Sequence, residues 1–269
     1  MNVKDSLDKY EKRQQRGQVS IDDIERYRDS SVQSLAALLC SANAQERTIG
    51  ATIIGDRKLT ELTWILCEAL RTETHLYPRI GISEALGKMG EQAVVPLIGL
   101  LGMIGDNQET SLPLKYFNKK SYPLPRDIAA RTLMKIGVLA IPELIKKIAN
   151  NDGFDTQQAI DALGGIVSKN CHKSALLVML SALDRYSANE ITTWKIVRAL
   201  SAFQYLETVT CLLTILDTRP EAAIRWEAIR SIGQIGISSP DIRDKLQRYA
   251  DDYNTEIRTA YKITIAQLS

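Results

Sequence analysis

The stretch EALGKMGEQAVVPLI (residues 84–98) decides the fold, because two helical patterns meet in it at a glycine. Before Gly90, apolar residues recur at positions i, i+3, i+4 and i+7, the spacing of one helix face; they are Ile82, Ala85, Leu86 and Met89. After Gly90, the segment 93–104 is apolar almost all round, and Pro96 falls in its first turn, where a missing N–H costs little. We therefore predict a helix that ends at Gly90, where glycine supplies the left-handed backbone of a helix end, and a second helix over 93–104.

The same pattern recurs along the chain, which indicates a structural repeat. It is clearest in PRDIAARTLMKIGVLAIPELIKKI (125–148) and in RWEAIRSIGQIGISSPDIRDKL (225–246), which turn at Gly137 and Gly236. The turns lie roughly 30 to 37 residues apart, apart from one gap of 47 residues. Looser copies turn at Gly55, in IDALGGIV (160–167) and in RALSAFQ (198–204).

Local signals support helices throughout. Two segments rich in β-branched residues, TVTCLLTIL (208–216) and YKITIAQL (261–268), keep a helical apolar register, so we predict helices there as well. Three signals mark expected helix starts: Ser30-x-x-Gln33, Thr218-x-x-Glu221 and Ser239 followed by Pro240.

The repeated motif Arg…Ala-Leu-Gly-x-Met/Ile-Gly…Ala-Val-x-Pro-x-Leu/Ile resembles HEAT repeats, most closely those named after the phycobilisome (PBS) lyases. The resemblance covers roughly residues 30–269. It implies an all-α fold of armadillo type, an α-α superhelix (a HEAT-like solenoid) of about six to seven helix pairs, in which stacked pairs share one core. Residues 1–29 are predicted to be N-terminal capping helices; the alternative is an arm that orders on a partner. The apolar pairs of this segment are Leu7 with Tyr10 and Ile21 with Ile24.

Charge and composition limit the class of partner. The 269 residues include 34 basic and 32 acidic groups, a net charge of +2, so no strong field of one sign recruits nucleic acid or a membrane surface. The chain has no run of eighteen apolar residues, and its N-terminus lacks the apolar core of a signal peptide. The four cysteines form no CxxC pair, so we expect reduced, buried thiols in a cytoplasmic protein.

Candidate catalytic and metal-binding residues are few. GISEALGKM (81–89) departs from a phosphate-binding loop, because five residues separate its glycines and Met89 stands where Ser or Thr would hold magnesium. The two histidines, His75 and His172, form no HExxH motif, and the His-Glu pairs of HEAT-repeat deoxyhypusine hydroxylases are missing. We interpret Cys171 beside His172 as chance adjacency, with a reactive thiol as the alternative. The prediction is no catalytic residue, no metal and no cofactor.

The longest gap between turns contains GDNQETSLPLKYFNKKSYPLP (105–125), which we call the insertion. Its basic and aromatic residues could contact phosphates and bases, or anchor a protein partner. The alternative is that the rings fold back over a repeat edge while the lysines stay in water. The residues concerned are Lys115, Tyr116, Phe117, Lys119, Lys120 and Tyr122.

The resemblance also suggests a second binding surface, because in HEAT repeats the second helix of each pair usually lines the concave face. Trp64 shares a helical face with three polar residues, so an exposed Trp64 would serve as an interface anchor. The alternative is a solvated surface of mixed charge, with Trp64 packed against the next repeat. The recurrent Arg79, Arg126 and Arg225 are expected to hold adjacent repeats together. The polar positions predicted for the concave face are Glu61, Trp64, Glu68, Arg71, Lys146, Lys147, Asn150, Asp184, Arg185, Arg243, Asp244 and Arg248.

Three functions follow as hypotheses. The first is a non-catalytic scaffold that grips a protein partner on its concave face, because a surface of alternating sign suits proteins better than polyanions. The second, by resemblance alone, is a bilin lyase subunit acting on a phycobiliprotein, or a phycobilisome-associated chaperone-like protein; no residue here matches a lyase functional motif. The third is a HEAT-like DNA-binding protein, which near-neutral charge disfavours.

Overall fold

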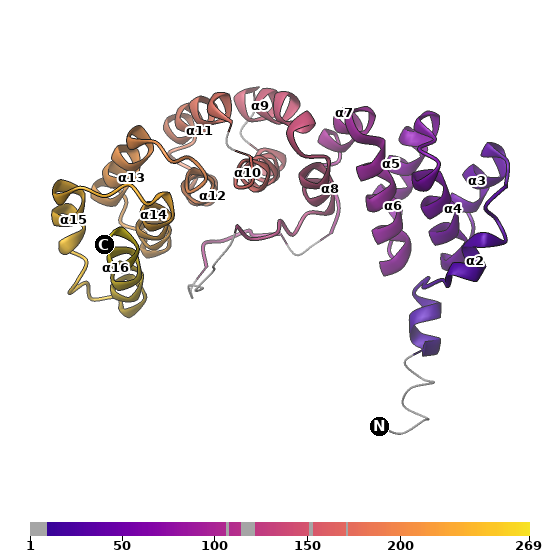
Figure 1. Cartoon of the computed structure of the whole chain (residues 1–269), viewed down its shortest axis with the longest axis horizontal. Coiled ribbons are helices and arrows are strands. Elements are labelled where there is room, and N and C mark those ends of the chain that lie inside the picture. The colour runs from indigo at the N-terminus through magenta and orange to yellow at the C-terminus, as the bar shows by residue number, and fades with distance from the viewer. Residues whose placement is uncertain (1–9, 106–107, 114–121, 151–152, 171) are drawn as a thin grey trace, which may run out of the picture.

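The computed structural model describes residues 10–105, 108–113, 122–150, 153–170 and 172–269. Every regular element in these ranges is a helix, and the helices follow one another in pairs along an arch (Figure 1). The most extensive contacts join helices that are one or two places apart in the sequence. Over the described residues, the structure therefore confirms the predicted all-α solenoid.

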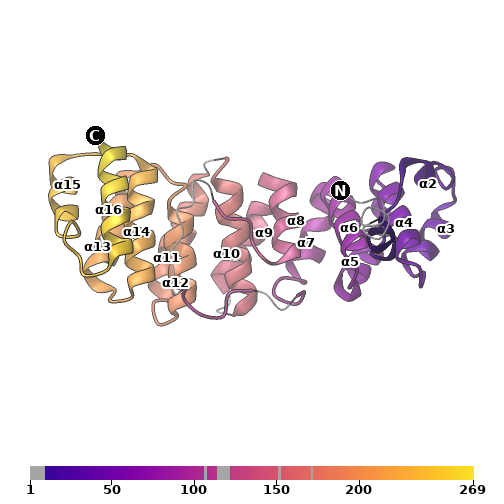
Figure 2. The ribbon, with the colours of Figure 1, turned by 90° about the horizontal axis from the view of Figure 1, so that it is seen from below.

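The arch has two rows of helices, seen from the side in Figure 1 and from below in Figure 2. The inner row holds the first helix of each pair: α4 (Ala44–Asp56), α6 (Leu76–Met89), α8 (Ile128–Ile136), α10 (Phe154–Val167), α12 (Glu190–Leu200), α14 (Ala222–Ile235), and the closing helix α16 (Thr255–Leu268). The outer row holds α3 (Val32–Leu39) and the second helices: α5 (Thr63–Thr72), α7 (Val94–Ile98), α9 (Ile141–Asn150), α11 (Lys173–Arg185), α13 (Leu206–Thr218) and α15 (Pro240–Gln247). Short elements precede α3, α5, α7 and α9: α2 (Ile21–Glu25), η1 (Thr60–Leu62), η2 (Gly90–Ala93) and η3 (Gly137–Ala140).

The position of the second helices corrects the expectation from the sequence, which assigned them to the concave face. Figure 1 shows them on the convex side, with the first helices lining the concave side. Neighbouring inner-row helices pack more extensively on one another than neighbouring outer-row helices do. Small residues permit this: a Cβ added at Gly55 would lie 2.7 Å from Ala85 Cα, and one at Gly164 would lie 2.9 Å from Ala199 Cβ. The more closely packed row becomes the inside of the curve.

The apolar stripes of successive helices form one continuous buried core. Leu86 of α6, Leu133 of α8 and Ile229 of α14 are all fully buried within it. The β-branched segments 208–216 and 261–268 lie in α13 and α16, as predicted. Burial of one helical face therefore outweighs local strand propensity in both segments.

Glycine ends three of the helices as the sequence predicted. The φ angles of Gly90, Gly137 and Gly236 are 63°, 79° and 73°, a region that favours glycine. The helix after the first of these turns is shorter than predicted, because α7 ends at Ile98 and the chain then turns through Gly102 at φ 77°.

Other predicted turns lie near the expected positions, but glycine does not form them. Gly55 is inside α4, and the chain leaves this helix through Lys58 at φ 50°. Gly164 and Gly165 are likewise inside α10, which continues to Val167. The physical role of these three glycines is close packing rather than chain reversal.

The predicted helix starts have mixed outcomes. Ser239 caps α15, and its Oγ accepts a hydrogen bond of 3.2 Å from the backbone N–H of Ile242, as expected. At the first repeat the cap is Ser31 rather than Ser30. Thr218 is the last residue of α13, so the capping box predicted there is wrong.

The described part of the N-terminal segment lies against α4. The Oγ1 of Thr48 donates a hydrogen bond of 2.7 Å to the carbonyl oxygen of Gly17. Two apolar residues predicted for a cap, Tyr10 and Ile21, are 56% and 77% exposed. This segment therefore contacts the first repeat while part of its apolar surface faces solvent.

Candidate functional site

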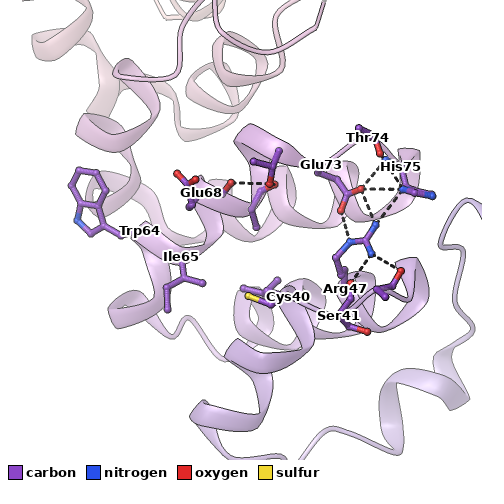
Figure 3. Close-up of a pocket in the computed structure, with 13 residues that line it drawn as sticks. Cys40, Ser41, Arg47, Trp64, Ile65, Glu68, Glu73, Thr74 and His75 are labelled. Carbon is purple, nitrogen blue, oxygen red and sulfur yellow. Dashed lines mark hydrogen bonds and ion pairs between the residues drawn. The ribbon is translucent and has the colours of Figure 1, made fainter.

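A pocket of about 590 Å³ lies between the C-terminal end of α3 and α5 (Figure 3). Cys40 lines it from the end of α3, and Ile65 and Glu68 line it from α5. In Figure 3, Cys40 and Ile65 face the gap from the two helices. The volume lies in the range of pockets that accept small molecules or side chains of a partner.

Trp64 stands at one end of this pocket and is 69% exposed. Its helix is held rigidly, because Leu66 and Leu70 of α5 are fully buried. One turn after Trp64, Glu68 accepts a hydrogen bond of 3.0 Å from Arg71 Nε. The structure thus brings Trp64 and Glu68 together at the pocket, while Glu61 and Arg71 are exposed nearby and do not line it.

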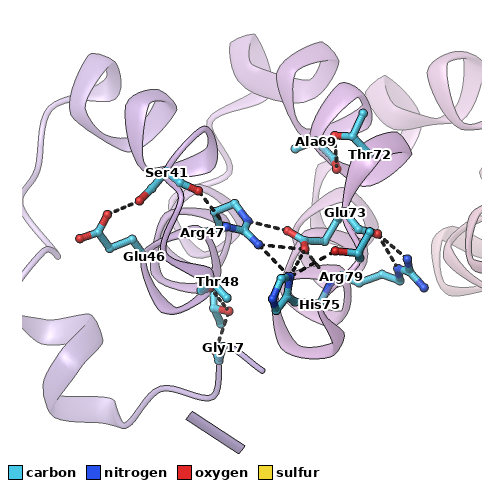
Figure 4. Close-up of polar contacts among 12 residues, drawn as sticks. Gly17, Ser41, Glu46, Arg47, Thr48, Ala69, Thr72, Glu73, His75 and Arg79 are labelled. Carbon is cyan, nitrogen blue, oxygen red and sulfur yellow. Dashed lines mark hydrogen bonds and ion pairs between the residues drawn. The ribbon is translucent and has the colours of Figure 1, made fainter. Parts of the chain in front are cut away.

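A polar cluster forms the other end of the pocket (Figure 4). Arg47 of α4 binds the carboxylate of Glu73 with two nitrogens, Nε at 2.7 Å and the second guanidinium nitrogen at 3.0 Å. The backbone N–H of His75 donates to the same carboxylate at 2.7 Å, and Arg79 Nε donates to the Glu73 carbonyl oxygen at 3.1 Å. Burial alone would raise the pKa of Glu73, but the hydrogen bonds and charge of Arg47 lower it.

The same arrangement recurs near the C-terminus, which identifies its role. Arg225 lies 3.2 Å from the carboxylate of Asp252, and Arg258 donates to the Asp252 carbonyl oxygen. Arg225 is the fourth residue of α14, as Arg47 is of α4, and Arg258 is the fourth residue of α16, as Arg79 is of α6. We call each set of three residues an arginine clamp. Because it joins consecutive inner-row helices at two places, the clamp is a structural tie and not a reactive centre.

The recurrent arginines have three different contacts. Arg225 joins adjacent repeats through its clamp, as predicted. Arg79 holds the loop before its own helix. Arg126 lies 4.0 Å from Glu109 of the insertion. The sequence reasoning missed Arg47 and Glu73; an arginine in the first turn of an inner helix, with an acid 26 or 27 residues later, is the signal that marks both clamps.

The remaining residues predicted for the concave face are spread along the outer row. Several of their side chains tie neighbouring elements: Lys147 pairs with Asp155, and Arg248 pairs with Asp217 of the preceding repeat. Binding by these residues stays a prediction, because the structure gathers them into no single site. They are Lys146, Lys147 and Asn150 on α9, Asp184 and Arg185 on α11, and Arg243, Asp244 and Arg248 on or at the end of α15.

Of the residues predicted in the insertion, Tyr122 is within the described part of the chain. Its ring centroid lies 5.8 Å from the guanidinium carbon of Arg198 on α12. A Cβ at position 164 would clash with its hydroxyl, so Gly164 of α10 leaves room for this ring. Tyr122 therefore folds back onto the inner row. The other predicted residues, Lys115, Tyr116, Phe117, Lys119 and Lys120, lie outside the described residues.

The described thiols range from the exposed Cys40 to the buried Cys67. Burial raises the pKa of the Cys67 thiol to about 12, so it stays protonated at neutral pH. Cys40 is exposed at the pocket, and Cys171 lies outside the described residues. Within the described ranges, no three His, Cys, Asp or Glu side chains are grouped to hold a metal ion.

None of the helices in the described part of the chain combines the length and apolarity needed to cross a bilayer.

The fold defines the class of protein as a solenoid of stacked helix pairs. Part of the chain also matches a known protein family. The family described as HEAT repeats matches residues 176–266, about a third of the chain. The PBS-lyase type of repeat stays a prediction. No curated protein matches the chain.

Three solved structures are similar over most of the chain at low sequence identity. A designed armadillo repeat protein in complex with peptide (KR)4 is 14% identical, with a TM-score of 0.41, covering 89% of this chain and 100% of that chain. A second designed armadillo repeat protein is also 14% identical, with a TM-score of 0.43 and the same coverage. An engineered protein is 16% identical, with a TM-score of 0.43, covering 94% of this chain and 72% of that chain.

Proposed function

We propose that this protein is a non-catalytic scaffold that binds a protein partner at the pocket between α3 and α5, with Trp64 as the anchor. The observation that carries the proposal is the 69% exposure of Trp64 on a helix whose opposite face is fixed in the core. Tryptophan is enriched among the residues that contribute most to protein interfaces, because it offers a large contact area with little entropy to lose.

The surroundings of Trp64 favour one kind of partner segment. Two exposed glutamates flank Trp64 in sequence: Glu61 of η1 three residues before it, and Glu68 of α5, which is paired with Arg71, four residues after it. A lysine or arginine of the partner would stack on the indole face between these carboxylates. An adjacent apolar side chain would enter the gap between Ile65 and Cys40. We therefore propose a partner segment with a basic residue next to an apolar one.

The test begins with cross-linking capture by the wild-type chain and continues with the purified captured protein. We expect the Trp64→Ala variant to bind it about 30-fold more weakly, equivalent to about 2 kcal/mol for an anchor residue. The matched control is Leu177→Ala on α11, which removes a side chain that is 60% exposed elsewhere on the outer row. Wild-type affinity of the Trp64→Ala variant, or equal loss in both variants, contradicts the proposal.

Bilin attachment and duplex DNA binding stay predictions of the sequence. Mixing the protein with phycocyanobilin tests the first, since a bilin-handling protein gives a red-shifted, fluorescent complex. A salt-sensitive gel shift with duplex DNA tests the second.

A further inference from the structure

The described parts of the insertion lie on the concave side of the arch. In Figure 1 they run beneath α8 and α10, and in Figure 2 they cross in front of the inner row. Glu109 reaches α12, where its carboxylate lies 3.3 Å from Lys195 Nζ and 3.9 Å from Arg198. Tyr122 packs over Arg198 and against Gly164 of α10. The chain thus places a carboxylate and an aromatic ring from the insertion on its own inner face.

The groups beneath the insertion form a buried cationic centre. Lys195 is 0% exposed, and its Nζ lies 2.6 Å from the carboxylate of Asp161 on α10. Arg198 binds the other oxygen of the same carboxylate. Burial alone would raise the pKa of Asp161, but the two cations lower it, so this carboxylate is ionised at neutral pH.

Charge balance shows what Glu109 contributes. Lys195 and Arg198 bring two positive charges, and Asp161 brings one negative charge, so the centre without Glu109 carries an excess positive charge. Glu109 offsets this excess charge, although it also lies 4.0 Å from the half-exposed Arg126. Glu227 of α14, which pairs with Arg230 at 2.7 Å, is a further negative charge near Arg198. A buried excess charge is costly, so an anion is favoured at the position that Glu109 fills.

The insertion does not satisfy every hydrogen-bonding group of this centre, and it does not fill all the space beside it. The Nε of Arg198 is buried without a hydrogen-bond partner. Beside this contact, an open surface depression of about 640 Å³ lies between the insertion at Thr110 and Leu112 and the start of α12 at Asn189 and Glu190. Unpaired buried polar atoms and unfilled space both weaken an interface. The contact therefore has the right charge and imperfect packing, which suits an occupant that can be exchanged.

We infer that the concave face around Lys195 and Arg198 is a binding site for an extended segment of a partner protein that presents a carboxylate and an aromatic ring. In the free protein, Glu109 and Tyr122 occupy this site in cis. The carboxylate supplies the anion that the buried cations favour, and the ring stacks on the Arg198 guanidinium above Gly164. The inference rests on the proposed scaffold role but names a surface separate from the α3/α5 pocket and a partner of opposite charge.

The experiment supplies the insertion in trans. The probe is a fluorescein-labelled synthetic peptide with the sequence of residues 105–125, titrated with the 269-residue protein and followed by fluorescence anisotropy. The proteins compared are the wild type and the double variant Glu109→Gln/Tyr122→Ala. A matched control peptide carries the same two substitutions.

We expect the unsubstituted peptide to bind the double variant at least about 10-fold more tightly than the wild type, because the wild-type site is already filled and only a small fraction is free to bind. The control peptide should bind neither protein. Binding should weaken as the salt concentration rises, because a carboxylate–cation contact is being formed. Circular dichroism and the unfolding midpoint establish that the double variant is folded.

Two results overturn the inference: failure of the unsubstituted peptide to bind the folded double variant, and equal binding of the two peptides. If the double variant does not fold, the Glu109→Gln variant takes its place. The inference is then overturned if this variant binds the unsubstituted peptide with the same affinity as the wild type. The Trp64→Ala variant should bind the peptide like the wild type. The experiment therefore distinguishes failure of the binding site proposed on the concave face from failure of the binding site proposed at the α3/α5 pocket.

Discussion

Glycines perform two different tasks in this protein, and the surroundings of each one determine which. At Gly90, Gly137 and Gly236 no atom lies within 4 Å of an added Cβ, and a positive φ is what requires glycine. At Gly55 an added Cβ would meet the backbone of the neighbouring helix at 2.7 Å. The first kind reverses the chain, and the second kind sets how closely inner-row helices approach.

The packing role of Gly55 predicts opposite effects of a Gly→Ala substitution at Gly55 and at a helical glycine without close neighbours. Gly55→Ala should lower the free energy of unfolding by about 1 to 3 kcal/mol, because the backbone of α6 must move away. Gly87→Ala is the matched control: its nearest neighbour, Lys135 Cβ, is 3.6 Å from an added Cβ, which is ordinary contact. Alanine there should raise the free energy of unfolding by about 0.5 to 1 kcal/mol, the gain expected inside a helix. Urea titration measures both, and a stabilising Gly55→Ala would refute the packing role.

At the scale of elements, the arginine clamp sets how consecutive inner-row helices are tied. The side chain of Glu73 is 3% exposed and takes two hydrogen bonds from Arg47, so losing its charge leaves a nearly buried guanidinium without its partner. His75, the histidine beside the pocket, donates its backbone N–H to this carboxylate. The proximity of this histidine to a carboxylate thus arises from a repeated structural tie.

We expect Glu73→Gln to lower the free energy of unfolding by about 2 kcal/mol at neutral pH, the value of a charged hydrogen-bonded pair. Because the pKa of Glu73 is lowered in the folded state, the carboxylate stabilises the fold above its unfolded pKa of about 4.3 and loses this effect as the pH falls through the folded value. The difference between variant and wild type should therefore shrink below about pH 4.

The control for the clamp is Glu68→Gln, which changes an exposed glutamate paired with Arg71 on the same helix. Exposed pairs of this kind contribute little to stability, so its unfolding midpoint should equal that of the wild type. A pH-independent effect of Glu73→Gln would show that shape, rather than charge, is what Glu73 contributes.

At the scale of the whole molecule, the arch makes the protein more extended than a globule of equal length. A compact 269-residue protein has a radius of gyration of about 18 Å. Because successive pairs contact mainly their neighbours, the measured value should be clearly larger. Small-angle X-ray scattering checks this, and a value near that of the compact globule would contradict the open arch.

The sequence by itself determined that the chain forms paired helices around a shared core. This information is local: the 3.6-residue apolar stripes of 84–98, 125–148 and 225–246, and the glycines that end their first helices, act within a few turns of chain. The same period placed Trp64 on a polar face of its helix, but it left open whether Trp64 is exposed or packs against the next repeat; the structure shows it 69% exposed.

Only the tertiary structure decided which row of helices lines the concave face, which glycines serve packing, and what the insertion covers. These depend on distances between residues far apart in sequence, such as Gly55 to Ala85 or Glu109 to Lys195. No helical period encodes such distances. The closer packing of the inner row sets the curvature, and the curvature determines which side chains a partner can reach.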